Sequence, residues 1–126
     1  MSSPKRQLIL VVDDDRDLNS LLTISLERDG FETHAVYDGD ESIEWLQDNV
    51  PDAVVLDIML PTVDGLEVLK AIRADKRTKQ TPVVIFSVLE ADLNRQEGLR
   101  LGADSYLGKT VGVLELFAEI KRLLKK

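Results

Sequence analysis

Charged and polar side chains follow four short apolar segments of the chain, at the point where each segment ends. In chain order, these side chains are Asp13-Asp14-Asp15, Asp57, Ser87 and Lys109. Carboxylates that lie close together repel one another and raise each other's pKa unless a cation joins them. If folding brings these side chains together, they predict a cation site with a hydroxyl and an ammonium group beside it.

The apolar segments alternate with helical patterns along the chain. Short apolar runs, typical of strands buried on both faces, lie at 8–12, 33–37, 53–56, 83–86 and 105–108. Periodic apolar residues predict helices at 16–29, 43–50, 66–72, 92–101 and 111–124. Strands that alternate with helices run parallel through right-handed crossovers. The order therefore predicts an α/β fold, a doubly wound sheet of five parallel strands with helices on both faces.

Sheets of this kind bind ligands beyond the carboxyl ends of their strands, where the strand order reverses. In the flavodoxin-like order 2-1-3-4-5, the first, third, fourth and fifth strands are consecutive neighbours. These four strands are the ones that end in Asp13-Asp14-Asp15, Asp57, Ser87 and Lys109. The fold therefore predicts that the carboxylates, the hydroxyl and the ammonium group converge in one pocket.

The helical patterns also predict which side chains face the sheet. The expected inward stripe of the first helix includes Leu18, Leu21, Leu22 and Leu26. The expected inward stripe of the last helix is Leu114, Phe117, Ile120 and Leu124.

The composition limits the class of protein. A length of 126 residues fits one domain, here 1–126 with its core at about 7–124. The net charge of −7 argues against direct binding of nucleic acid, which needs a positive surface. Because the chain has no cysteine and a single histidine, thiol chemistry and multi-histidine metal sites are excluded. The sequence shows neither a signal peptide nor a membrane span, so we expect a cytoplasmic protein.

The predicted pocket offers oxygen ligands alone, which favours a hard divalent ion such as Mg²⁺, with Mn²⁺ as the alternative. Mg²⁺ held by two carboxylates is typically completed by a phosphoryl oxygen. One aspartate could then be a nucleophile that forms an acyl phosphate, with Lys109 and Ser87 binding the phosphoryl group. The alternative for Asp13, Asp14 and Asp15 is that they cap or neutralise the N-terminus of the first helix.

Four segments carry a resemblance to a known family. They are residues 9–15 (ILVVDDD), 56–61 (LDIMLP) with Asp64-Gly65, 84–87 (VIFS) and 102–109 (GADSYLGK). In this order and at this spacing, they make the chain resemble the receiver domain of bacterial two-component response regulators, from Gln7 to Leu124. The resemblance implies a phosphorylation-activated signalling switch in a phosphorelay, and not an enzyme that turns over an external substrate.

The resemblance also implies a role for each residue of the pocket. Asp57 would accept a phosphoryl group from the phosphohistidine of a sensor histidine kinase or of a histidine phosphotransfer protein. Asp13, Asp14 and Asp57, with the backbone carbonyl of Met59, would hold Mg²⁺. Lys109 occupies the position of the family's lysine.

Two further positions match the family's conformational switch. Ser87 occupies the position of the switch hydroxyl, and Tyr106 occupies that of the switch aromatic residue. In such proteins, phosphorylation draws the hydroxyl inward and the ring follows, which remodels the face formed by the fourth helix, the fifth strand and the last helix. That face would bind a downstream protein or effector domain, and homodimers through it are common in the family.

Several positions depart from the family pattern. Thr110 stands where receivers usually have a proline preceded by a cis bond, and Val88 stands where they generally have alanine or glycine. These differences support an alternative function, a pseudo-receiver that binds partners without phosphorylation.

Two other departures bear on the phosphorylated form. Met59 and Leu89 are apolar and cannot orient an attacking water, so we expect a long-lived acyl phosphate. An aspartyl-phosphate phosphatase would need an acid in place of Met59. A flavodoxin would need a phosphate-binding loop rich in Ser, Thr and Gly where the three aspartates stand.

Overall fold

The computed structural model describes residues 6–88 and 92–125, which build one five-stranded parallel sheet. Its strands are β1 (Leu8–Val12), β2 (Glu32–Val36), β3 (Ala53–Leu56), β4 (Val83–Ser87) and β5 (Ser105–Gly108). The order across the sheet is β2-β1-β3-β4-β5, and every neighbouring pair is parallel. The predicted flavodoxin-like order 2-1-3-4-5 is therefore confirmed.

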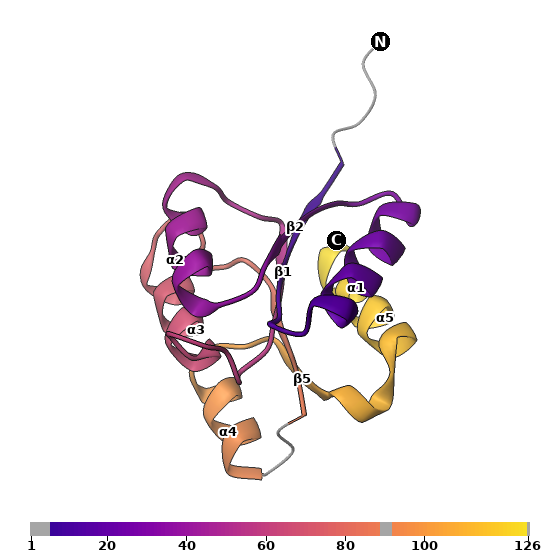
Figure 1. Ribbon diagram of the computed structural model, residues 1–126. Helices are drawn as coiled ribbons and strands as arrows, with labels where there is room; N and C mark the ends of the chain where they lie inside the picture. The colour runs from indigo at the N-terminus through magenta and orange to yellow at the C-terminus, as the bar shows by residue number, and fades with distance from the viewer. Residues whose placement is uncertain (1–5, 89–91, 126) are drawn as a thin grey trace.

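Five helices cover the two faces of this sheet. They are α1 (Arg16–Arg28), α2 (Gly39–Asp48), α3 (Gly65–Ala74), α4 (Asp92–Arg100) and α5 (Val113–Leu124), with a short 3₁₀ turn, η1 (Lys109–Val111). Helices α1 and α5 lie on one side of the sheet, and α2, α3 and α4 lie on the other (Figure 1). Among the described residues, every helix is too short or too polar to cross a membrane.

The alternation of side chains along β1 shows why both faces of the sheet need a covering layer. Leu10 and Val12 belong to the core on the α2–α3 side, whereas Ile9 and Val11 belong to the core on the α1–α5 side. All four side chains are 0% exposed. A strand buried on both faces has to be apolar throughout, so polar side chains can occur only beyond its end.

The buried stripe of α5 differs from the prediction. Leu114 is 83% exposed, whereas Leu116 and Ile120 are buried against the sheet. The helix begins at Val113 and not at 111, because η1 and Gly112, with a φ of 97°, intervene. Leu114 lies two positions before Leu116, about 200° around the helix. Ile120 is buried as expected, and Phe117 and Leu124 pack against the same core, so the periodicity misplaced Leu114 and missed Leu116.

The buried stripe of α1 also differs from the prediction by one position. Leu21 is 51% exposed, and the buried residues of α1 are Asn19, Leu22 and Leu26. Leu22 and Leu26 are buried as expected, whereas the polar residue Asn19, which was not part of the predicted stripe, is buried and Leu21 is not.

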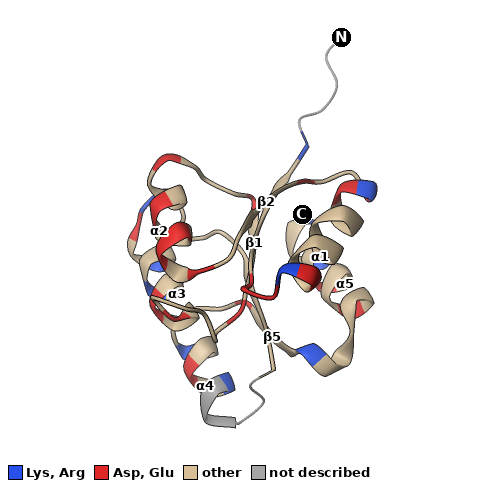
Figure 2. Cartoon of the chain, viewed as in Figure 1, with Lys and Arg blue, Asp and Glu red and all other residues tan. Residues whose placement is uncertain are grey.

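The helix N-termini lie at the same edge of the sheet as the predicted pocket. Asp15, Asp38 and Asp64 cap α1, α2 and α3 by accepting a hydrogen bond from the backbone N–H three residues further on. Acidic residues form the loop that joins the end of β1 to α1 (Figure 2). The local fold thus assigns part of this acidic edge to helix capping.

Candidate functional site

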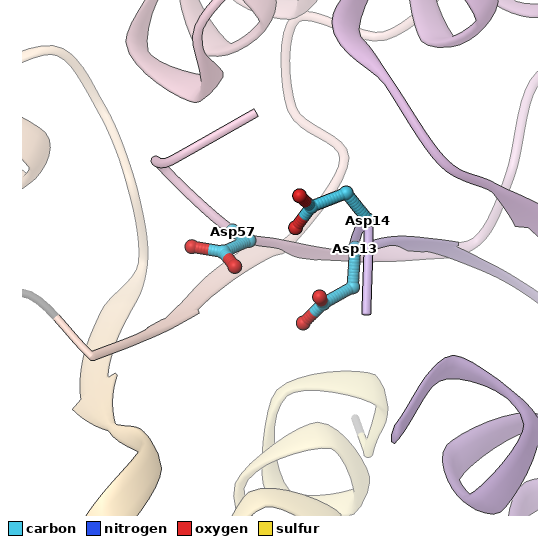
Figure 3. A group of neighbouring side chains, drawn as sticks. All are labelled: Asp13, Asp14 and Asp57. Carbon is cyan, nitrogen blue, oxygen red and sulfur yellow. The ribbon is translucent and has the colours of Figure 1, made fainter. Parts of the chain in front are cut away.

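Three carboxylates meet at the carboxyl ends of two neighbouring strands. Asp13 and Asp14 follow β1, and Asp57 follows β3, and the three side chains lie close together at this edge of the sheet (Figure 3). A ligand oxygen from each of the three lies within 4.8 Å of the others. Asp13 and Asp57 are buried, whereas Asp14 is exposed. Oxygen donors in such a group, without histidine or cysteine, fit a hard ion such as Mg²⁺.

One ammonium group joins the two buried carboxylates. Lys109, at the end of β5, places its Nζ 2.8 Å from Asp13 Oδ2 and 2.9 Å from Asp57 Oδ2. The Lys109 side chain is only 16% exposed, so water screens these ion pairs weakly. With Asp14 included, three carboxylates share one ammonium group, and the cluster keeps a surplus of negative charge.

The second oxygen of Asp57 is held by neutral donors. Ser87, fully buried at the end of β4, donates its hydroxyl to Asp57 Oδ1 at 2.8 Å. The backbone N–H of Met59 donates to the same oxygen at 3.1 Å. Lys109 binds the other oxygen, Oδ2, so both carboxylate oxygens have fixed partners. The Asp57 side chain is therefore locked in one orientation.

Burial and charge shift two pKa values in this cluster. Burial raises the pKa of Asp13 above its ordinary 3.8, and the nearby charge of Asp57 adds to this, against hydrogen bonds from Lys109 and Asp15. Burial alone would lower the pKa of Lys109, but hydrogen bonds and charge from Asp13 and Asp57 outweigh it and raise that pKa. Lys109 is therefore positively charged at neutral pH, and the surroundings of Asp13 disfavour its ionised form.

The loop after β3 must fold closely over Asp57. Its backbone is anchored by the Asp57 N–H, which donates to Val12 O at 3.0 Å, and by the Gly65 N–H, which donates to Ile58 O at 2.8 Å. A Cβ atom at Gly65 would lie 2.1 Å from the carbonyl oxygen of Asp57. Only glycine allows this approach, so Gly65 supports the geometry of the site.

The three consecutive aspartates divide into different roles. Asp15 accepts a hydrogen bond from the Leu18 N–H at 3.1 Å and caps α1, as the alternative prediction held. The backbone N–H of Asp15 donates to Asp13 Oδ1 at 2.9 Å and helps to orient that carboxylate. Asp13 and Asp14 are left to face Asp57.

The departure at Thr110 does not move Lys109 away from the cluster. Every peptide bond in the described residues is trans, including the one between Lys109 and Thr110. The chain continues into η1 directly at Lys109, whose ammonium group still reaches both Asp13 and Asp57. Val88, the other departure beside Ser87, is 56% exposed.

Tyr106 lies on β5 next to Ile85 of β4 and is 4% exposed. It is thus buried, as a switch residue turned inward would be. From α4, the Arg95 guanidinium lies 5.9 Å from the Tyr106 ring centroid and donates to the Tyr106 carbonyl at 3.3 Å. A Cβ atom at Gly98 would lie 3.5 Å from the ring and 2.6 Å from Ile85 Cδ1. Gly98 therefore lets α4 approach the ring closely.

Two predictions, for Leu89 and for the Met59 carbonyl, stay predictions. Leu89 falls outside the described residues. The Met59 carbonyl stays a predicted ligand, while the Met59 side chain is 53% exposed beside the cluster.

One residue next to the site was missed by sequence reasoning. Asn19 of α1 is 0% exposed, and its amide contacts the backbone of Asp13. The available signal was its position three residues before Leu22 and seven before Leu26, on the stripe that packs against the sheet.

Comparison with known proteins now decides the family. The family model described as "Response regulator receiver domain" matches residues 9–121. The chain belongs to this family. It is 42% identical over 118 residues to the transcriptional regulatory protein CpxR of Escherichia coli K12, which covers 94% of this chain. The chain spans about half (49%) of the length of CpxR.

Solved structures agree with this assignment. The receiver domain of the Francisella response regulator 1452 is 34% identical, with a TM-score of 0.86 over 94% of this chain and 97% of that one. The receiver domain of sensor histidine kinase PA1611 of Pseudomonas aeruginosa is 25% identical, with a TM-score of 0.86 over 95% and 98% of the two chains. That structure has a magnesium ion coordinated in its active site cleft.

Proposed function

We propose that this receiver domain is a phosphorylation-activated switch in which Asp57 accepts a phosphoryl group from the phosphohistidine of a sensor kinase or of a histidine phosphotransfer protein. The observation that carries the proposal is the position of Lys109 Nζ, within 2.9 Å of both Asp13 and Asp57, while Ser87 binds the other oxygen of Asp57. This arrangement holds a carboxylate nucleophile between a cation site, an ammonium group and a hydroxyl donor.

In the transfer step, an Asp57 carboxylate oxygen forms a bond to phosphorus while the bond from phosphorus to the imidazole nitrogen breaks. The imidazole keeps the electron pair of the broken bond. The Lys109 ammonium and the Ser87 hydroxyl, which hold the free carboxylate, are placed to bind phosphoryl oxygens after transfer. The burial of Asp57 gives these charged hydrogen bonds more weight than they would have in water.

Asp13, Asp14 and Asp57 would hold Mg²⁺ together with the Met59 carbonyl, and Mn²⁺ has the same ligand preference. When bound, the ion neutralises charge on the phosphoryl group during its transfer. The surplus of carboxylates over the single ammonium group of Lys109 supports this role, because a cation relieves their repulsion.

Ser87 and Tyr106 would connect the same site to a surface formed by α4, β5 and α5. We define the α4–β5–α5 face as the exposed sides of α4, β5 and α5. In the structure the Ser87 hydroxyl already points to Asp57 and Tyr106 is already buried, so the inward arrangement is accessible to this chain. Phosphorylation would favour this arrangement and fit the α4–β5–α5 face for a downstream protein, an effector domain or a second copy of the chain.

The phosphodonor would approach past two exposed apolar side chains. Met59 is 53% exposed and Val88 is 56% exposed, and they follow β3 and β4 beside Asp57 and Ser87. A kinase or phosphotransfer protein in the cytoplasm could pack against them while its histidine reaches Asp57.

The pseudo-receiver alternative rested on Val88 and Thr110, and it loses support from the geometry. Lys109 keeps its contacts with Asp13 and Asp57 despite Thr110. We therefore retain phosphoryl acceptance as the function that the site supports best.

Intact-mass spectrometry after incubation with Mg²⁺ and a small acyl phosphate tests this function. A single phosphoryl adduct is expected on the wild type and on the matched control Asp17→Asn, which removes an exposed carboxylate from α1. Asp57→Asn should show no adduct. An adduct that persists in Asp57→Asn, or a wild type that binds Mg²⁺ and stays unmodified with both a small donor and a phosphorylated histidine phosphotransfer protein, would refute the proposal.

A further inference from the structure

Asn19 is the fourth residue of α1 and lies against the loop that carries the acidic pair. Its side chain is completely buried, and its Nδ2 faces three backbone carbonyls. The distances from Nδ2 are 3.1 Å to Asp13 O, 3.1 Å to Val36 O and 3.4 Å to Val11 O. One amide group thus connects α1 with the ends of two neighbouring strands, β1 and β2.

These contacts fix the point where β1 turns into the acidic loop. Val36, the last residue of β2, pairs with Val12, the last residue of β1. The Val36 carbonyl also accepts a hydrogen bond from the Asp13 N–H at 3.2 Å. Asp13 is therefore held on both sides of its Cα atom, at its N–H by β2 and at its carbonyl by Asn19. The Asp13 carbonyl belongs to the Asp13–Asp14 peptide, so the hydrogen bond from Asn19 also fixes the peptide that sets the direction of both carboxylates.

The choice of asparagine at this position is not explained by packing. Leu22 and Leu26 occupy the same buried stripe, so an apolar side chain would fit the pattern of α1. The Asn19 carbonyl oxygen, Oδ1, is buried and has no hydrogen-bond partner among the described residues. An unsatisfied buried acceptor destabilises a fold. The amide therefore lowers the stability of the fold through Oδ1. What distinguishes it from an apolar side chain is that Nδ2 donates to the backbone carbonyls of β1, β2 and Asp13.

We propose that Asn19 is a positioning residue for the cation site, which it pre-organises by holding the backbone of Asp13 and Asp14 so that their carboxylates face Asp57. The inference rests on the proposed function, because it assumes that this cluster binds Mg²⁺. Groups that orient metal ligands without touching the metal commonly change metal affinity about 10–100-fold when they are removed. Asn19 acts in this way through the main chain of its ligands.

The test compares Asn19→Leu with a control that loses a buried hydrogen bond at the opposite end of the sheet. Thr78 is 2% exposed, and its hydroxyl donates to Ile72 O at 2.7 Å, so Thr78→Val is a matched control. Calorimetric titration with Mg²⁺ should show a dissociation constant about tenfold higher for Asn19→Leu. Thr78→Val should keep the wild-type value. Asn19→Thr, which retains one donor, should lie between Asn19→Leu and the wild type.

A second readout needs no metal. Hydrogen exchange at the Asp13 and Asp15 amides, measured by NMR in the metal-free protein, should be faster in Asn19→Leu and unchanged in Thr78→Val. Equal Mg²⁺ affinity and equal exchange in Asn19→Leu and the wild type would overturn the positioning role and leave the proposed function intact. A wild type that does not bind Mg²⁺ would overturn both.

Discussion

At the carboxyl ends of the strands, the ammonium group of Lys109 lies among three carboxylates, whereas at the amino ends the guanidinium group of Arg73 pairs with one carboxylate and with backbone carbonyls. Lys109 joins Asp13 and Asp57, and within residues 6–88 and 92–125 no cation forms an ion pair with Asp14. Arg73, near the C-terminus of α3, has one carboxylate partner, Asp104, at 3.0 Å. The charges of the Arg73 pair thus cancel, whereas those of the Lys109 cluster leave a negative surplus.

The contacts of Arg73 show what a balanced edge achieves. Its guanidinium donates to the carbonyls of Gly102 at 2.9 Å and Thr81 at 2.7 Å, in addition to Asp104. Asp104 Oδ2 in turn accepts from the backbone N–H of Val83 at 2.8 Å. The network ties α3 to the starts of β4 and β5, and its charges neutralise one another.

The difference separates a structural site from a functional one. In the Arg73–Asp104 pair, the two charges neutralise each other, so an added ion would gain little there. At the Lys109 edge, two carboxylates are buried and a third is exposed, so a divalent cation and a phosphoryl group can complete the charge balance. The surplus of carboxylates over ammonium groups therefore distinguishes the functional site, and substitutions can reduce or enlarge it.

Lys109→Met enlarges the surplus and is expected to have the largest effect. It leaves Asp13 and Asp57 buried without their shared cation, which should lower the free energy of unfolding by about 3 kcal/mol at neutral pH. Urea unfolding with EDTA measures this loss. Mg²⁺ should recover part of it, since an ion that binds only the folded state stabilises it.

The control for this prediction is Lys121→Met, which breaks an exposed ion pair with Asp29. A surface pair contributes roughly 0–1 kcal/mol, so little change is expected. If both variants lost the same small amount of stability, the shared-cation account of Lys109 would be wrong.

Arg73→Met tests the balanced edge and should have a smaller, purely structural effect. The carbonyls of Gly102 and Thr81 would lose their charged donor, at a cost of about 2 kcal/mol in the free energy of unfolding. Mg²⁺ affinity, measured by calorimetry on the folded variant, should equal that of the wild type. A drop in Mg²⁺ affinity would show that the two edges are coupled and would contradict the separation drawn above.

Sequence reasoning was most successful where a residue's place follows from strand order. Asp57, Ser87 and Lys109 each end a strand, and the parallel order alone brings them to one edge. Their contacts with one another required no knowledge of loop conformation beyond that order. The N-cap role of Asp15 was equally accessible, because capping depends on local spacing.

Sequence reasoning was less exact at the margins of the buried faces of α1 and α5, although most of the residues expected inside pack against the core. Leu21 and Leu114 were expected inside and are exposed, since α1 and α5 carry apolar residues on more than one face. Asn19 was passed over because only apolar residues were counted in the stripe, although its spacing from Leu22 and Leu26 places it on the buried face. Its role depends on carbonyls of two strands that are distant in sequence, and only the folded chain brings them within reach.

Asp13→Asn reduces the negative surplus and is the subtlest test of the comparison. Burial and the charge of Asp57 raise the pKa of Asp13 above its ordinary 3.8, so the folded state binds a proton at this site more readily than the unfolded state. The stability contributed by that proton is present below pH 3.8 and is lost as the pH rises through the raised pKa. At neutral pH, the ionised carboxylate therefore opposes folding.

Replacing this carboxylate by an amide should raise the free energy of unfolding of the metal-free protein at neutral pH. The gain should vanish below pH 3.8, where the wild-type side chain is protonated in both states. Thermal unfolding with EDTA at several pH values measures both effects, and the same variant should bind Mg²⁺ at least tenfold more weakly. Greater stability together with weaker binding would show that the surplus charge is retained for the ligand, because the fold alone is better off without it. A variant less stable than the wild type at neutral pH would mean that Asp13 is already neutralised by Lys109, and the contrast with the Arg73 edge would then lie in exposure and not in charge.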